Sequence, residues 1–67
     1  MELSARNQLQ GVVKSVENGA VMSEVVVDVG GQEMVAAITV NSAERLNIQV
    51  GDTVTVIVKS TDVMIGK

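Results

Sequence analysis

The chain has 67 residues, a net charge of −3 and no Cys, His, Phe, Trp or Tyr. Disulfides and a Cys/His zinc site are therefore excluded, and nucleic acid is not an expected partner, because its phosphates need a basic surface. No stretch approaches the about 20 apolar residues of a membrane span, and no signal peptide is visible. We expect one cytoplasmic domain over residues 1–67 that completes its core by self-association, with a marginal monomer as the alternative.

The first half of the chain predicts two hairpins. Its many valines favour strands, because β-branched side chains fit a pleated surface. Asn18-Gly19, a dipeptide typical of hairpin turns, separates a first strand at Arg6–Val16 from a second at Val21–Val29. Gly30-Gly31 predicts a second tight turn, because glycine accepts positive φ. A third strand follows at Gln32–Val40.

The second half predicts one helical turn and two strands. The turn is "NSAERL", residues 41–46, with Ser42 as the expected N-cap. A fourth strand follows at Thr53–Ser60, and "DVMIG" at 62–66 predicts a short fifth. Five strands with a helical turn between the third and fourth predict an all-β, five-stranded Greek-key barrel of the OB type. A small β-sandwich is the alternative, but it would leave strand edges exposed.

The residue types do not indicate catalysis. There is no His, the commonest general acid or base at neutral pH. Lys59 and Ser60 are neighbours on a strand, so their side chains would point to opposite faces. The carboxylates are scattered without metal-ligand spacing. We therefore expect no enzyme and no metal held by direct side-chain coordination, and the missing aromatics also argue against single-stranded nucleic acid.

Two of the five cations stand among small hydroxyl residues. Ser4 lies close to Arg6, and Lys59 is followed by Ser60 and Thr61. A guanidinium fork, an ammonium, hydroxyls and free backbone N–H groups are what a small oxyanion needs. Barrel closure would bring the two segments together. On residue types alone, however, pairing of both cations with surface carboxylates is the favoured interpretation, because most charged residues have no special role.

Four blocks that span nearly the whole chain carry a family resemblance. They are "SARNQLQGVV" (4–13), "NGAVMSEVVVDVGG" (18–31), "AAITVNSAERL" (36–46) and "VGDTVTVIVKSTDVMI" (50–65). In these blocks the sequence resembles the molbindins, or Mop proteins, and the related TOBE domain of molybdate transport ATPases and molybdate-responsive regulators. The resemblance implies an OB-type barrel in a homohexamer, a trimer of dimers, that binds oxyanions between subunits.

The resemblance also implies the positions of the anion ligands. They are Ser4, the backbone of Ala5, Arg6, Thr39, Lys59 and Ser60. Thr39 would come from the neighbouring subunit. A second class of site maps onto the "NGAV" turn at Gly19, Ala20 and Val21, where a plain hairpin turn is an equal alternative.

The function implied by the resemblance is reversible binding of molybdate, with tungstate as an alternative, for intracellular molybdenum storage or homeostasis. Arg6 and Lys59 would supply two positive charges to a dianion. Two other functions stay open. One is an oligomeric protein-interaction module, in which "SARN" only begins a strand. The other is a molybdopterin carrier, which would favour a large apolar pocket and stacking aromatics that the chain lacks.

Overall fold

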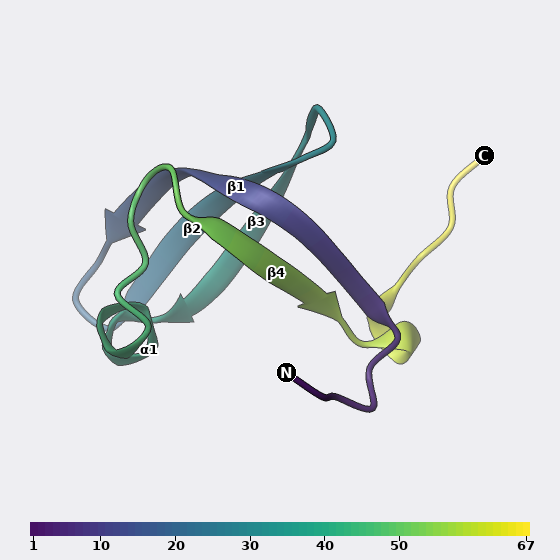
Figure 1. Cartoon of the computed structure of the whole chain (residues 1–67), viewed down its shortest axis with the longest axis horizontal. Helices are drawn as coiled ribbons and strands as arrows, with labels where there is room; N and C mark the ends of the chain where they lie inside the picture. The colour runs from purple at the N-terminus through teal and green to yellow at the C-terminus, as the bar shows by residue number, and fades with distance from the viewer.

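The computed structural model describes all 67 residues. Its elements are β1 Asn7–Asn18, β2 Met22–Val29, β3 Gln32–Thr39, α1 Val40–Arg45, β4 Thr53–Val58 and the 3₁₀ turn η1 Ser60–Asp62. The four strands form one antiparallel sheet in the order β3-β2-β1-β4, and the sheet curves strongly, with α1 at one end (Figure 1). Neither helical segment is long or apolar enough to span a bilayer.

Both predicted hairpins form. The β2–β3 turn is Gly30-Gly31, whose φ angles of 58° and 91° lie in the region that favours glycine. The Asp28 carboxylate accepts a hydrogen bond from the Gly31 N–H at 2.9 Å. The β1–β2 connection differs from the predicted one, because Asn18 still belongs to β1 and the connection runs from Gly19 to Val21. The Gly19 N–H closes it by donating to the Met22 carbonyl at 2.8 Å.

The short helix lies between β3 and β4, as predicted, but begins earlier. Thr39 is its N-cap, with an extended backbone at φ −69° and ψ 148°. The Thr39 hydroxyl accepts from the Ser42 N–H at 3.0 Å and donates to the Ser42 hydroxyl at 2.8 Å. The prediction of Ser42 as the cap is therefore wrong. Thr39 takes that place because it ends β3 in the conformation that a capping residue needs.

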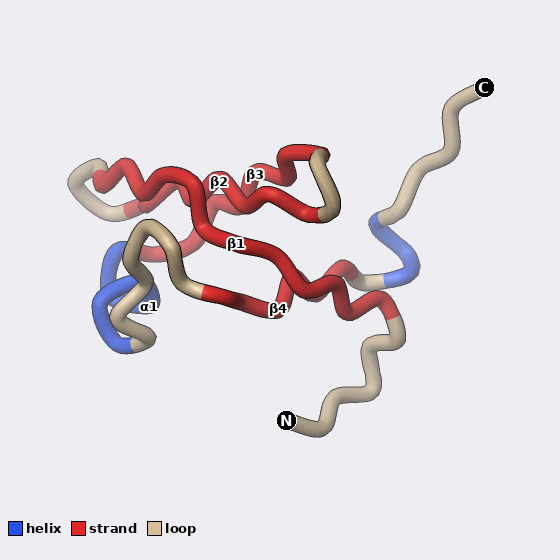
Figure 2. The backbone as a smooth tube through the Cα atoms, turned by 45° about the horizontal axis from the view of Figure 1, so that its top comes forward, coloured by secondary structure: helices blue, strands red, loops and turns tan.

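The predicted closed, five-stranded barrel is wrong for the chain as it stands. The sheet has four strands and is open, with β3 and β4 as its edges. The "DVMIG" segment forms no strand, and Met64 and Ile65 are each 91% exposed. A strand forms only beside an edge that completes its hydrogen bonds. After η1 the tail runs away from the sheet and lies along no edge (Figures 1 and 2).

The core of the single chain is small. Only six of 67 residues are buried, and Val13, Val25 and Val27 form the central cluster. The accessible surface is 5335 Å², whereas a folded monomer of 7.0 kDa has roughly 4,000 Å². The radius of gyration is 12.3 Å, against roughly 11 Å for a compact domain of this length. The open sheet leaves apolar surface that a closed domain would bury.

Gly11 lies where β1 passes close to β2. A Cβ at this position would be 2.5 Å from Val27 Cγ1 and 2.7 Å from the Asp28 carbonyl oxygen. We expect Gly11→Ala to lower the free energy of unfolding by about 1–3 kcal/mol, because the core must shift around the added methyl. Urea denaturation measures this. Gly66→Ala is the control, since a Cβ there meets nothing within 4 Å, and equal losses in both variants would contradict the packing argument.

Ser23 interrupts the valines that face the core from β2. Its side chain is 1% exposed, and its hydroxyl has no hydrogen-bond partner. A buried hydroxyl without a partner is destabilising, because it has lost its bonds to water. We therefore expect Ser23→Ala to raise the free energy of unfolding by about 1 kcal/mol. A loss of stability in the same denaturation experiment would show that the hydroxyl has a partner after all.

Candidate functional site

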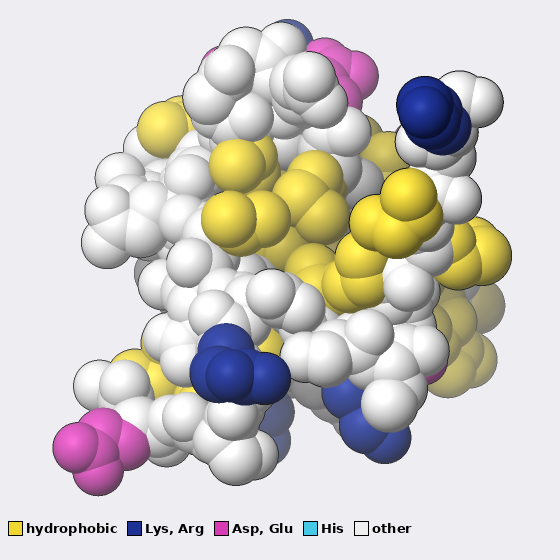
Figure 3. All heavy atoms as spheres, turned by 90° about the vertical axis from the view of Figure 1, so that its right-hand side faces the viewer, with side chains coloured by type: hydrophobic (Ala, Val, Ile, Leu, Met, Phe, Trp, Pro, Cys, Tyr) yellow, Lys and Arg dark blue, Asp and Glu magenta, His cyan; other side chains and the backbone are white.

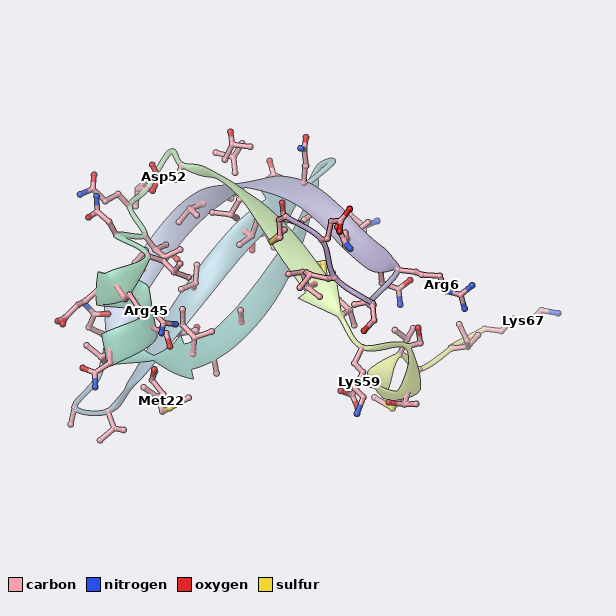
Figure 4. The ribbon with its side chains drawn as sticks, turned by 60° about the horizontal axis from the view of Figure 1, so that its bottom comes forward. Arg6, Met22, Arg45, Asp52, Lys59 and Lys67 are labelled. Atoms are coloured by element: carbon pink, nitrogen blue, oxygen red, sulfur yellow. The ribbon has the colours of Figure 1, made fainter.

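The register of β1 and β4 brings the two predicted ligand segments together. Asn7 pairs with Val58 at the end of the ladder. One further step in this antiparallel register places Arg6 opposite Lys59. The expected proximity of the two segments is therefore confirmed. Figure 4 shows both side chains at the same end of the sheet, where they extend into solvent and not toward each other. This end of β1 and β4, with residues 4–6 and 59–60, is called the cation end below.

Neither cation at this end is neutralised by a carboxylate. The single salt bridge of the chain joins Lys14 and Glu33 at 2.8 Å on β1 and β3, and this hydrogen bond and the charge of Glu33 raise the pKa of Lys14. The interpretation that Arg6 and Lys59 pair with carboxylates is therefore wrong. Figure 3 looks onto this side of the molecule and shows Lys and Arg side chains around a patch of apolar ones. The cation end is free to take an external anion.

The backbone at the cation end also has free donors. The N–H groups of Ala5, Arg6 and Lys59 donate to no acceptor in the chain. The carbonyls of the same N-terminal segment are occupied, because the Gln8 side chain donates to the Ala5 carbonyl at 2.7 Å and the Gln8 N–H to the Arg6 carbonyl at 3.1 Å. These two hydrogen bonds from Gln8 hold Ala5 and Arg6 in place and leave the N–H groups of both residues unpaired. Sequence reasoning missed this residue, although a Gln three positions after Ala5 can reach back to that backbone.

The other half of the cation end is held by η1. The Asp62 N–H donates to the Lys59 carbonyl at 2.9 Å, which closes the turn. Ser60 is exposed and begins the turn. It also lines a groove of about 390 Å³ with apolar neighbours that include Leu9 and Met34. On the N-terminal side, Ser4 is exposed and lines a separate open hollow. Both hydroxyls are accessible at the same end as the two cations.

Thr39 does not lie at the cation end. It pairs with Met22 at the start of β2, and Met22 lies at the opposite end of the sheet from Arg6 (Figure 4). Its hydroxyl already takes part in the helix cap. Within one chain, Thr39 therefore cannot contact an anion held by Arg6 and Lys59. Its assignment as a ligand stays a prediction that requires a second subunit.

The weaker site predicted at Gly19, Ala20 and Val21 lies in the β1–β2 connection near α1, where the Val21 carbonyl accepts from the Val40 N–H at 2.8 Å. A hollow of about 380 Å³ beside it is lined by Glu17 and Glu24, which face each other across the two strands, and by no basic side chain. Two carboxylates oppose an anion. The geometry favours the plain turn, and the anion site there stays an unsupported prediction.

The chain is similar to several known proteins. The family model of the TOBE domain matches residues 3–65. Molybdenum-pterin-binding protein 2 of Clostridium pasteurianum is 46% identical over 66 residues, which cover 97% of each chain. The structure of a molybdate-binding protein from Sporomusa ovata superposes with a TM-score of 0.95 at 43% identity, over 100% of both chains. The cytoplasmic molybdate-binding protein ModG, with molybdate bound, gives a TM-score of 0.85 at 38% identity, over 90% of this chain and 43% of ModG.

Proposed function

The chain belongs to the Mop family of TOBE-domain proteins, and from this we propose that it binds molybdate reversibly, at the cation end and between subunits. One observation carries the proposal. The β1–β4 register ends at the pair Asn7–Val58, so Arg6 and Lys59 lie at the same end of the sheet, and neither cation has a carboxylate partner. The ModG relative is a molybdate-binding protein with molybdate bound, which supports the same ligand here.

The chemistry of the cation end suits a tetrahedral dianion. Arg6 offers a planar fork of N–H donors, and Lys59 adds a second positive charge. The hydroxyls of Ser4 and Ser60 and the unpaired backbone N–H of Ala5 complete a shell of donors. A neighbouring subunit that covers this end would exclude water and strengthen every one of these contacts. The net charge of −3 does not oppose this, because a local positive site can exist on an acidic protein.

The exposed surface supports self-association. The chain exposes roughly 1,300 Å² more than a folded monomer of its mass, and a second chain would also bring a Thr39 to the cation end. We propose the homohexamer, a trimer of dimers, that the family resemblance implies. Light scattering of the purified protein gives the mass of the assembly. A mass of 7.0 kDa, that of one chain, at all concentrations would contradict the proposal.

The proposed role is storage and homeostasis of molybdenum in the cytoplasm. Binding involves no bond cleavage, so bound molybdate stays available for release. Sulfate is also a tetrahedral dianion, so selection against it rests on the size of the shell. Tungstate is expected to bind because it has the same charge and shape. The pterin in the names of relatives is disfavoured for this chain, which has no aromatic side chain to stack on a pterin.

Isothermal titration tests the proposal. Protein stripped of bound anions is titrated with molybdate, tungstate and sulfate in one phosphate-free buffer at one salt concentration. We expect heat and saturation with molybdate and tungstate, and little response to sulfate. Folded protein that gives no heat with any of the three anions would contradict molybdate binding.

A further inference from the structure

The N-terminal side of the cation end is attached to the sheet through one residue. Residues 1–6 precede β1 and form a loop (Figure 2). Two hydrogen bonds hold this loop, and Gln8 donates both: its side-chain amide donates to the Ala5 carbonyl at 2.7 Å, and its backbone N–H donates to the Arg6 carbonyl at 3.1 Å. The second bond closes a three-residue turn at the start of β1. No other hydrogen bond of the chain reaches residues 1–6.

The side-chain hydrogen bond of Gln8 fixes the direction of one peptide group. The chain has no cis peptide bonds, and in a trans peptide the carbonyl and the N–H point in opposite directions. Because the Ala5 carbonyl points to the Gln8 amide, the Arg6 N–H of the same peptide group points away from Gln8. This N–H has no acceptor in the chain. Gln8 therefore determines how the backbone donors of this loop are presented.

The opposite side of the cation end is fixed by different contacts. Lys59 and Ser60 directly follow β4, and the η1 turn that begins at Ser60 closes on the Lys59 carbonyl at 2.9 Å. The two sides are joined by the pair Asn7–Val58, the last of the β1–β4 ladder. Beyond that pair, the distance between the two sides depends on Gln8 on one side and on η1 on the other.

We propose that Gln8 is a positioning residue that sets the size selectivity of the anion site. It holds the loop from Ser4 to Arg6 at a fixed distance from Lys59 and Ser60, so the shell of donors keeps the size of the larger dianion. A shell that cannot contract makes only long, weak contacts to sulfate, whereas a mobile loop closes around either anion. The inference rests on the molybdate binding proposed above and explains how the chain distinguishes the two anions.

The strand that carries Gln8 also offers a matched control. Gln10 lies two residues further along β1, so its side chain is on the same face of the sheet. Both glutamines are exposed, but the Gln10 side chain forms no hydrogen bond. The amide is uncharged, so replacement of either residue leaves the charges of the cation end unchanged. A difference between the two variants therefore reports the hydrogen bond to Ala5.

The direct test is titration of Gln8→Met and Gln10→Met with molybdate, alone and in competition with sulfate. Methionine keeps a flexible side chain but has no donor. We expect the molybdate affinity of Gln8→Met to fall about 3- to 10-fold, the range that corresponds to one neutral hydrogen bond, while its sulfate affinity stays the same or rises. Gln10→Met should keep the wild-type values for both anions. Unchanged molybdate affinity in Gln8→Met, equal losses for both anions, or equal behaviour of the two variants would overturn the proposal.

Relaxation of the backbone amide nitrogens, measured by NMR on the full chain without anion, provides a second readout. We expect larger picosecond-to-nanosecond motion at Ala5 and Arg6 in Gln8→Met than in the wild type, with β1 and β4 unchanged. Thermal unfolding should stay close to that of the wild type, because the lost bond lies outside the core. Unchanged motion at Ala5 and Arg6 would overturn the positioning role, whatever the affinity.

The wild-type titration separates this inference from the proposed function. A wild type that binds molybdate, together with wild-type selectivity in Gln8→Met, would refute only the role of Gln8. A wild type that binds no molybdate would refute the proposed function and the selectivity with it.

Discussion

Arg6→Ala is expected to weaken molybdate binding by about 10- to 100-fold. Hydrogen bonds to charged groups contribute about 1.5–3 kcal/mol each, and each 1.4 kcal/mol corresponds to a tenfold change in affinity. Arg6 is exposed and forms no salt bridge in the free chain. Its removal should therefore leave the fold unchanged, and the loss should appear only in the binding titration.

Two further variants sharpen this test. Arg6→Lys keeps the charge but loses the planar fork, so it should also bind more weakly than the wild type. Arg45→Ala removes the same type of side chain from α1, at the other end of the molecule (Figure 4), and should bind nearly as well as the wild type. Unchanged affinity in Arg6→Ala, or equal losses in Arg6→Ala and Arg45→Ala, would refute the assignment of Arg6.

Lys59→Met is expected to weaken molybdate binding by about tenfold or more, because it removes one charge-assisted donor. Methionine keeps a flexible apolar side chain, so the change tests the charge and not the packing. Since Lys59 is exposed and unpaired, thermal unfolding of the anion-free variant should match that of the wild type. The same titration measures the loss of affinity.

The matched control is Lys14→Met. Lys14 lies on β1 in the exposed ion pair with Glu33, away from the proposed ligands, and such pairs contribute little to stability. The affinity of the Lys14→Met variant for molybdate should stay close to that of the wild type. If Arg6 and Lys59 contact the same anion, both single variants should weaken the same class of site, and the double variant should bind more weakly than either of them. Two classes of site in the titration, each weakened by only one of the two variants, would show that the two cations act at separate sites.

Local signals in the sequence predicted most of the fold. Gly30-Gly31 and Asn18-Gly19 placed both hairpins, because the conformation of a tight turn depends on a few adjacent residues. The helix was placed correctly, but its start depended on where β3 ends, which the pattern does not show. The fifth strand failed for a different reason. "DVMIG" has strand character, yet a strand requires a partner edge, and after η1 this segment runs away from both free edges of its own sheet, β3 and β4 (Figure 1).

The candidate site was predictable in part. The proximity of the segments around Arg6 and Lys59 was expected from closure of a barrel, whereas the open sheet brings them together through the antiparallel pairing of β1 with β4. Gln8 and Gly11 were missed, because their roles depend on a local hydrogen bond and on a close contact between strands. Thr39 could be placed as a ligand only by resemblance, since a contact between subunits leaves no pattern in one sequence.

The most direct measurement is an anomalous difference map at the molybdenum absorption edge from crystals grown with molybdate. We expect the molybdenum peak at the cation end, with Arg6 and Lys59 of one subunit and Thr39 of a neighbour around the anion. A molybdenum peak elsewhere on the molecule, or no peak in crystals that contain molybdate, would contradict the proposed site.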